Sequence, residues 1–297
     1  MRKRITIREI CDTVINLSFY QAIPLLLVIL TTSVTQVFAN IAYVVNYGDN
    51  SISRIDTASN MVVGSPIAVG PEPVAIAITP NGKFAYVLDF GDDSVSLIDT
   101  TSNMVVGATI SDGSGPLAIA ITPNGEFVYV VNYYDNSVTV IDTASNMVIG
   151  PPIIVGFFPI AIAITPNGAF AYVANLGDNT VSVINTTSNT VVGPPIAVGS
   201  GPIFIAITPS GEFAYVVNGG DNIVSVINTA SNTVVGPPIG VGSTPYAIAI
   251  TPSGEFAYVV NEGDNSVSVI NMASNMVVGP PIAVGPEPVS LLCFLCS

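Results

Sequence analysis

The sequence of 297 residues contains no histidine and no tryptophan, and only six of its residues are lysine or arginine. Without histidine, the chain cannot build a Ser-His-Asp triad or offer an imidazole ligand to a metal ion. Charged residues make up 9% of the chain, which is low for a cytosolic protein. These absences exclude the commonest hydrolytic and metal-dependent active sites and leave carboxylates as the main titratable groups.

The few cations are concentrated at the start of the chain. Four of the six lie in the first eight residues, so residues 40–297 keep only Arg54 and Lys83 as cations, against 18 carboxylates. A surface this acidic cannot neutralise a phosphate backbone by releasing its counterions. We therefore expect no nucleic-acid partner and no attraction to anionic membrane surfaces.

Cysteine is equally scarce. Cys11 lies near the start of the chain, and Cys293 and Cys296 lie within its last five residues. The Cys-x-x-Cys spacing of the terminal pair has neither a following helical pattern nor a basic neighbour that would lower a thiol pKa. We expect a pair of buried thiols or a terminal disulfide there, and the sequence leaves that choice open.

Residues 1–39 have the order of an export signal, because a basic start is followed by an apolar core at Ala22–Leu30 and by Val37-Phe38-Ala39, which suits a signal peptidase. The uncharged run is also long enough to span a bilayer. The alternative is thus an uncleaved N-terminal membrane anchor, which would be the protein's only contact with a membrane. Either way, we expect residues 40–297 to be exported to the periplasm, to the cell surface or to the medium.

An internal repeat occupies the rest of the chain, so that residues 40–297 are six whole units of 43 residues. A repeat length of 20–50 residues indicates a solenoid, a propeller or a similar array. The repeat is marked by a tyrosine in an apolar strand pattern that recurs at Tyr43, Tyr86, Tyr129, Tyr172, Tyr215 and Tyr258.

Each unit has the pattern of four short strands, as residues 66–106 illustrate. Two apolar runs, Pro73–Ile78 and Phe84–Leu88, are separated by an Asn-Gly turn of the kind that closes hairpins. Ser94–Ile98 alternates polar and apolar residues as a half-buried strand does. A fourth strand begins at Met104–Val106, and in other units it continues into Gly-Pro-Pro-Ile. Because proline cannot donate a ladder hydrogen bond, we place this strand at the sheet edge.

Four antiparallel strands per repeat predict an all-β fold, a six-bladed β-propeller of four-stranded antiparallel blades. The repeats begin at the second strand of a blade, and residues 286–292 repeat the pattern of a first strand. We therefore expect this C-terminal strand to complete the first blade and close the ring. The alternative is an incomplete seven-bladed propeller, because the tail from Leu292 to Ser297 departs from the repeat.

The repeated motif Tyr-Val-x-Asn, followed by Gly-Asp-Asn-x-Val-Ser-Val-Ile and accompanied by Ala-Ile-Thr-Pro-x-Gly, resembles the YVTN-family β-propeller repeat of bacterial proteins and archaeal surface-layer proteins. The resemblance covers residues 40–297 and departs at the C-terminal tail and at Asp89, which replaces the asparagine of the motif. It implies an exported propeller on a cell surface or in a periplasm. It brings no catalytic residues, and many members of that family have seven blades.

One aspartate per repeat lies in the turn between the second and third predicted strands, on the face where propellers usually bind ligands. Glu262 and Glu287 add further acids to that face. A ring of carboxylates could collect Ca²⁺, but aspartate and asparagine are ordinary turn residues, and six separate turns cannot converge on one ion. We expect no cofactor and no bound metal, with Ca²⁺ as the lesser alternative and with candidate ligands Asp49, Asp92, Asp135, Asp178, Asp221 and Asp264.

The repeats differ most in the loops that join one blade to the next. Phe157 and Phe158 stand where the other repeats have Pro-Glu, Ser-Gly or Ser-Thr, and further aromatic residues flank the turns on the same face. An aromatic patch of this kind marks a partner surface, unless its rings pack inward between the blades. The predicted partner-binding residues are Tyr47, Phe90, Tyr133, Tyr134, Phe157 and Phe158.

These features together predict an exported, non-enzymatic propeller scaffold that binds a protein or glycan partner at the cell envelope. The alternative is a lactonase-like hydrolase that depends on carboxylates or on a divalent cation, because carboxylate pairs can perform acid–base chemistry. The sequence shows no catalytic cluster that matches such an enzyme. We therefore expect the protein not to be an enzyme, and we assign no catalytic residue.

Overall fold

The computed structural model describes residues 41–111 and 113–290. The predicted export segment 1–39 and the two C-terminal cysteines lie outside these residues. The described residues form two compact units: those through Ile196 belong to an N-terminal unit and those from Ala197 onward to a C-terminal unit. No helix within the described ranges is long and apolar enough to cross a membrane.

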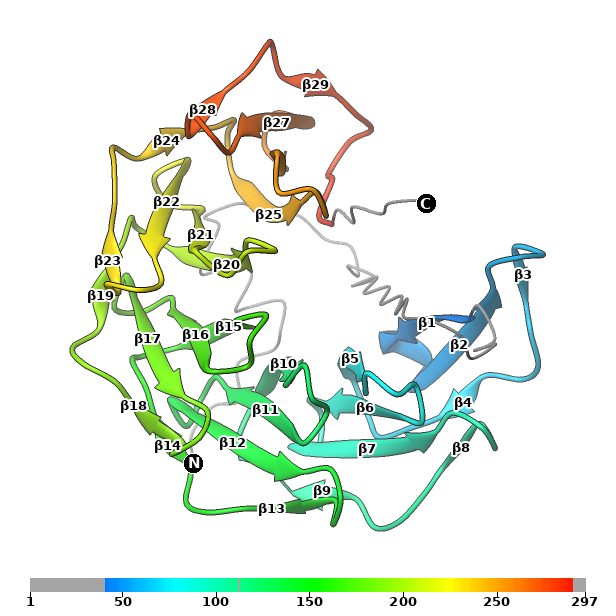
Figure 1. Ribbon diagram of the computed structural model, residues 1–297. Coiled ribbons are helices and arrows are strands. Elements are labelled where there is room, and N and C mark those ends of the chain that lie inside the picture. Colours follow the sequence, from blue (N-terminus) through cyan, green and yellow to red (C-terminus); the bar gives the residue numbers. More distant parts are fainter. Residues whose placement is uncertain (1–40, 112, 291–297) are drawn as a thin grey trace, which may run out of the picture. The chain divides into compact units, whose positions relative to one another are not determined.

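The N-terminal unit contains four sheets, coloured from blue to green in Figure 1. The first has a short 3-10 helix, η1 (Tyr47–Asp49), between its first two strands. The strands of the first two sheets are β1 (Ile41–Asn46), β2 (Ser51–Asp56), β3 (Met61–Val62) and β4 (Ile67–Ala68), then β5 (Pro73–Ile78), β6 (Phe84–Asp89), β7 (Ser94–Asp99), β8 (Met104–Val105) and β9 (Ile110–Ser111). Those of the next two are β10 (Pro116–Ile121), β11 (Phe127–Asn132), β12 (Ser137–Asp142), β13 (Met147–Val148) and β14 (Ile153–Ile154), then β15 (Pro159–Ile164), β16 (Phe170–Asn175), β17 (Thr180–Asn185), β18 (Thr190–Val191) and β19 (Ile196–Ala197).

The C-terminal unit contains two further sheets of the same design. Their strands are β20 (Pro202–Ile207), β21 (Phe213–Asn218), β22 (Ile223–Asn228), β23 (Thr233–Val234) and β24 (Ile239–Gly240), then β25 (Pro245–Ile250), β26 (Phe256–Asn261), β27 (Ser266–Asn271), β28 (Met276–Val277) and β29 (Ile282–Ala283).

Every sheet is antiparallel and follows the order of the sequence, which is the pattern of a propeller blade. The predicted fourth strand, however, is two strands of two residues each. In the second sheet β8 pairs with one end of β7 and β9 with the other. Between such pairs the chain turns at a glycine with positive φ, such as Gly193 at +69°, which Pro194 and Pro195 follow in that repeat. The second repeat has the same interruption at Gly107 without a proline, so the glycine turn divides the outer edge, and where prolines follow the glycine they also lack an N–H to donate.

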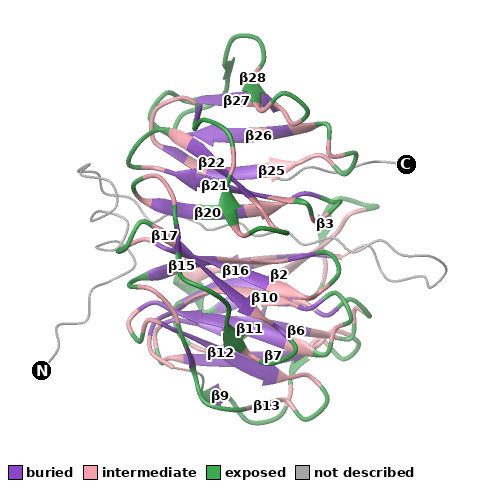
Figure 2. Cartoon of the chain, turned by 60° about the vertical axis from the view of Figure 1, so that its left-hand side comes forward, coloured by how far each residue is buried: buried purple, intermediate pink, exposed green. Residues whose placement is uncertain are grey.

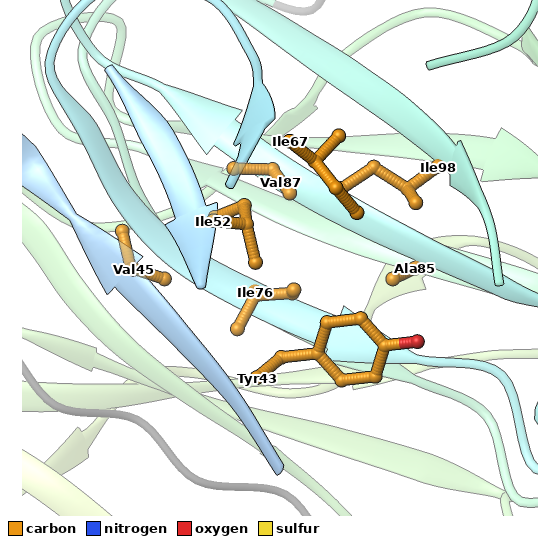
Figure 3. Close-up of a cluster of buried hydrophobic side chains, with 8 residues drawn as sticks. All are labelled: Tyr43, Val45, Ile52, Ile67, Ile76, Ala85, Val87 and Ile98. Carbon is orange, nitrogen blue, oxygen red and sulfur yellow. The ribbon is translucent and has the colours of Figure 1, made fainter. Parts of the chain in front are cut away.

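The second and third strands are the most buried elements of most complete sheets. In β6, β11, β16 and β21 every residue after the first is buried, whereas the short outer strands are largely exposed, as the purple and green regions of Figure 2 show. Consecutive sheets of the N-terminal unit pack face to face, so Tyr43 and Ile52 of the first sheet meet Ile76, Val87 and Ile98 of the second (Figure 3). Burial of these side chains supplies the main stabilisation of the stack.

Asparagines at positive φ close the turn after the third strand in each repeat. In the second repeat the Asp99 carboxylate accepts the N–H groups of Thr101 and Ser102, both at 2.8 Å, and Asn103 follows at φ +57°. Asparagine tolerates this left-handed conformation better than most residues. The Asp/Asn-Thr-x-Ser-Asn pattern of the sequence is therefore a turn with a defined backbone geometry.

The repeat tyrosines join one sheet to the next through these asparagines. The Tyr86 hydroxyl donates to Asn146 Oδ1 at 2.5 Å, and the Tyr129 hydroxyl donates to Asn189 Oδ1 at 2.5 Å. Tyr215 makes the same bond to Asn275 in the C-terminal unit. Burial raises the pKa of Tyr86 and of Tyr129 to about 12, so these phenols stay neutral donors. Each bond spans 60 residues of sequence.

The predicted closure of the first sheet by the C-terminal segment is not confirmed. Among the described residues β1 pairs only with β2, and residues 286–290 form no strand, while residues 291–297 lie outside the described part of the chain. The five innermost strands that do form are each joined to their partner by a short turn, as β5 is to β6. The tail has no such turn to β1, so pairing would carry the full entropy cost of bringing the ends of the chain together.

The tyrosine bond gives a test of the packing between sheets. We expect Tyr129→Phe to lower the free energy of unfolding by about 1–3 kcal/mol, because the change leaves Asn189 Oδ1 without its buried donor. Urea denaturation monitored by circular dichroism measures the loss. Tyr258→Phe is the matched control, since Tyr258 is half-buried and has no corresponding asparagine among the described residues. If Tyr129→Phe and Tyr258→Phe lowered the free energy of unfolding equally, the hydrogen bond from Tyr129 to Asn189 would not be what stabilises the packing of the two sheets.

Candidate functional site

The loops that join successive sheets lie beside the turns between second and third strands, and side chains of those turns hold the loop backbone, with two such contacts in several of the loops. In the loop at Phe157 and Phe158, the Phe157 N–H donates to Asp178 Oδ2 at 2.7 Å and the Phe158 N–H donates to Asn136 Oδ1 at 2.8 Å. The same arrangement holds Ser243 and Thr244 in the C-terminal unit. These contacts fix the loop backbone and leave the loop side chains free to vary.

The aspartates predicted as candidate calcium ligands therefore have a structural task. Four of them accept a loop N–H, namely Asp135, Asp178, Asp221 and Asp264. Asp92 accepts the Ser94 hydroxyl at 2.7 Å instead, because its loop begins with Pro71, which has no N–H. Asp49 lies in η1. Within residues 41–111 and 113–290, no group of three or more acidic or cysteine side chains is arranged to hold a metal ion.

Four of the six predicted aromatic residues form a continuous row in the N-terminal unit. The ring centroids of Phe90 and Tyr134 are 6.1 Å apart, and Tyr134 meets the edge of Tyr133 at 5.3 Å. Tyr133 in turn stacks on Phe158 at 5.0 Å, with an interplanar angle of 22°. We call this set of rings, together with Phe157, the aromatic row.

The aromatic row is partly core and partly surface. Phe90 and Tyr133 are buried, so the expectation that they lie on a surface is wrong, and their rings pack against neighbouring loops. Phe158 is 44% exposed and Phe157 is 61% exposed. Tyr47 is half-buried and makes a hydrogen bond to the Glu72 side chain. Burial, and next the Glu72 charge, raise the pKa of Tyr47.

Asp89 is the one position of the buried strand β6 where the repeat pattern is broken. In other repeats the equivalent asparagine donates to hydroxyl groups, as Asn175 Nδ2 does to Ser182 Oγ at 2.9 Å. Asp89 has no such donor, and its Oδ2 accepts the Ser96 hydroxyl at 2.6 Å. The side chain is fully buried, and its Oδ1 has no hydrogen-bond partner among the described residues. A Cβ on Gly70 would lie 2.6 Å from the carboxyl carbon, so the loop packs directly on this group.

Burial raises the pKa of Asp89 to about 6, and the charge of Asp92 contributes in the same direction, against the hydrogen bond from Ser96. A carboxyl held in this way costs stability whenever it is ionised. The sequence marks Asp89 as a departure from the motif, but it gives no indication of the burial that follows from it.

Glu262 and Glu287 form a carboxylate pair in the C-terminal unit that sequence reasoning did not assemble. Glu262 follows β26 at the position that holds Tyr47, Phe90 and Tyr133 in earlier repeats, and its N–H donates to Thr244 O at 2.9 Å. It is half-buried, and its Oε2 has no hydrogen-bond partner in the described residues. Burial, and next the charge of Glu287, raise the pKa of Glu262. Alignment of the repeats is the signal that could have found it, because glutamate replaces an aromatic ring there.

Asp89 predicts a measurable pH dependence of stability. Its folded pKa of about 6 lies above its ordinary value near 3.8, so the native state holds the proton more tightly. The tighter proton binding by Asp89 in the native state stabilises the fold fully below pH 3.8, and this stabilisation is lost as the pH rises through 6. We expect Asp89→Asn to raise the free energy of unfolding by about 1–3 kcal/mol at pH 7.5 and by much less at pH 4. Denaturant titrations at both values measure it.

The reciprocal change supplies the control for that measurement. Asn175→Asp places a carboxyl at the equivalent position and should introduce a similar loss of stability above pH 6. An Asp89→Asn variant whose stability relative to the native protein is the same at pH 4 and pH 7.5 would show that Asp89 is not held with a raised pKa.

Comparison with solved structures confirms the fold. The chain resembles hydrazine synthase of Kuenenia stuttgartiensis, with a TM-score of 0.72, 24% sequence identity and coverage of 84% of this chain and 85% of that one. It also resembles a protein of unknown function from Desulfotomaculum acetoxidans, with a TM-score of 0.71, 24% identity and coverage of 84% and 83%. At this level of identity the similarity concerns the fold alone. No curated protein matches the sequence.

A family match goes further than the fold. The sequence model of the family described as "Lactonase, 7-bladed beta-propeller" matches residues 40–235, which is well over half of the chain. This match confirms an all-β propeller of repeated antiparallel blades, whereas the YVTN resemblance and the six-blade count stay predictions. It also overturns the expectation that the protein is not an enzyme, which relied on the lack of histidine and of a recognisable catalytic cluster. The chain belongs to the lactonase family of seven-bladed β-propellers.

Proposed function

We propose that the protein is a lactonase-like hydrolase in which Glu262 is the general base. The observation that carries this assignment, beside the family match, is that Glu262 is half-buried, has an Oε2 without a hydrogen-bond partner among the described residues, and has a pKa raised by burial and by the charge of Glu287. A raised pKa brings Glu262 nearer to the pH at which a base works best. Its half-buried position also lets it touch a substrate, unlike the fully buried Asp89.

The proposed reaction needs one proton carrier and one water molecule. The Glu262 carboxylate takes a proton from the water molecule while the oxygen of that water attacks the carbonyl carbon of the lactone. The tetrahedral intermediate then collapses, the bond from the carbonyl carbon to the ring oxygen breaks, and the proton on Glu262 passes to that ring oxygen. The product is an open-chain hydroxy acid, and Glu262 is restored as a carboxylate. The proton is carried by a carboxylate in both steps, so we propose the carboxylate form of the hydrolase hypothesis.

The net negative charge of the protein limits the class of lactone that it can attract. Only Arg54 and Lys83 are cations among residues 40–297, so no cluster of positive charge can attract a phosphorylated or carboxylated lactone. We therefore propose that the substrate is an uncharged lactone. The signal-like order of residues 1–39 supports the further proposal that the enzyme works outside the cytoplasm.

Glu262→Gln tests the assignment of the base. We expect the native protein to open at least one neutral five- or six-membered lactone in a pH-stat assay, and we expect the variant to lower kcat by about 10²–10⁴-fold. Glu255→Gln, an exposed acid of the same unit that follows another turn, should leave kcat unchanged. If no neutral lactone in the panel is opened faster than in buffer, or if the two variants are equally active, the proposal is wrong.

Glu287→Gln tests the coupling of the two carboxylates. The Glu287 charge raises the pKa of Glu262, so its removal should lower that pKa and shift the acidic limb of the kcat/KM profile to lower pH. The value of kcat/KM on the pH-independent plateau should change less than the pH at which the acidic limb falls. If the acidic limb of the kcat/KM profile lies at the same pH in Glu287→Gln as in the native protein, then the titration of Glu262 does not produce that limb.

A further inference from the structure

We propose that the exposed end of the aromatic row, Phe157 and Phe158, is a docking surface for an arginine-bearing segment of a partner protein. The proposal concerns the N-terminal unit and uses neither Glu262 nor Glu287, so it stands apart from the proposed hydrolysis. It rests on three features of the described residues: exposed rings at a loop position with positive φ, a fixed loop geometry, and acidic side chains nearby.

The first feature is the backbone of Phe158. This residue has φ +53°, in the left-handed region that bulky residues avoid. Two of the equivalent positions are glycines, Gly115 at φ +72° and Gly201 at φ +65°, which adopt this conformation without strain. The other three, Glu72, Thr244 and Glu287, have the same positive φ as Phe158. The loop therefore tolerates a non-glycine residue here in four repeats, and only at Phe158 is that residue an aromatic ring, which is 44% exposed.

The second feature is the way the two phenylalanines are held. Hydrogen bonds from their N–H groups to Asp178 and Asn136 fix the loop, and the Phe158 ring stacks on Tyr133. Gly177 allows this approach, since a Cβ there would lie 2.8 Å from the Phe158 ring. Phe158 stays 44% exposed although its ring stacks on the buried Tyr133. The surface is therefore pre-organised, which lowers the entropy cost of binding.

The third feature is the charge around the rings. The turns and loops beside the row carry exposed or half-buried carboxylates, namely Glu72, Asp92, Asp93, Asp135 and Asp178. Both cations of residues 40–297 lie elsewhere: Lys83 directly precedes β6, at the opposite end of that strand from Asp92, and Arg54 lies within β2. An aromatic face in a negative field complements a cation, through ring–cation attraction and through long-range steering.

Arginine fits this surface better than lysine or a neutral sugar. Its planar guanidinium stacks on aromatic faces and is less strongly hydrated than an ammonium group, and it can bond to carboxylates at the same time. A neutral glycan would also stack on the rings and donate its hydroxyls to carboxylates, but it carries no positive charge that would gain from the negative field of the five acids. The chemistry of the surface therefore selects a guanidinium on a flexible segment of another protein.

The test uses the full chain and two synthetic peptides, measured by isothermal titration calorimetry. The probe is the acetylated and amidated peptide Gly-Arg-Gly-Arg-Gly, and its neutral counterpart carries citrulline in place of each arginine. We expect the arginine peptide to bind and the citrulline peptide to bind at least about 10-fold more weakly. Phe158→Gly should raise the Kd of the arginine peptide by about 2- to 30-fold.

Phe158→Gly also separates binding from folding, because glycine is the unstrained residue at this φ. Its melting temperature should equal or exceed that of the native protein. Phe204→Ala is the matched control: Phe204 is 38% exposed on β20, in the other unit, and its loss should leave peptide binding unchanged.

Four results would overturn the proposal. They are no binding of the arginine peptide at millimolar concentration, equal binding of the citrulline peptide, equal weakening by Phe158→Gly and Phe204→Ala, and displacement of the peptide by maltoheptaose in a manner that needs Phe158. The last result would identify the surface as a glycan site instead.

Discussion

The hydroxyl group of the repeat tyrosine joins one sheet to the next, and the regular spacing of the chain follows from this contact. Tyr86 and Tyr129 in the N-terminal unit, and Tyr215 in the C-terminal unit, each donate to an asparagine 60 residues further on. The acceptor lies in a turn whose φ is positive, so its position depends on the length of every strand between the two residues. One inserted residue would separate the buried hydroxyl from its partly buried acceptor. Where the bond forms, it therefore requires the 43-residue spacing that the sequence keeps.

A scaffold fixed in this way leaves the loop side chains free to differ. Asparagine and aspartate side chains hold the loop backbones, so the same position can carry Phe158, Thr244 or Glu287 without a change of fold. The chemistry of the protein therefore lies where the repeats diverge. Glu262 replaces an aromatic ring and gains a second carboxylate beside it, and Phe158 occupies a conformation that glycine adopts elsewhere.

Much of the fold could be predicted from the sequence, because strand alternation, Asn-Gly turns and edge prolines are local signals. The joining of sheets by Tyr129 could not, since donor and acceptor are remote in sequence, nor could the division of the outer strand into two pieces. Four of the predicted aromatic residues do meet, but their burial depends on packing that no repeat comparison shows. Glu262 did not stand out in the sequence because its raised pKa arises from burial and from the charge of Glu287, not from residue type. The absence of histidine was given too much weight against catalysis.

A double-mutant cycle on Tyr129 and Asn189 tests most directly whether this hydrogen bond couples one sheet to the next. The free energies of unfolding of the native protein, Tyr129→Phe, Asn189→Ala and the double variant give the interaction energy of the pair. The account predicts a coupling of about 1 kcal/mol or more, since the bond is partly buried, its donor is fully buried, and it joins separate sheets. Additive losses, with a coupling near zero, would contradict it.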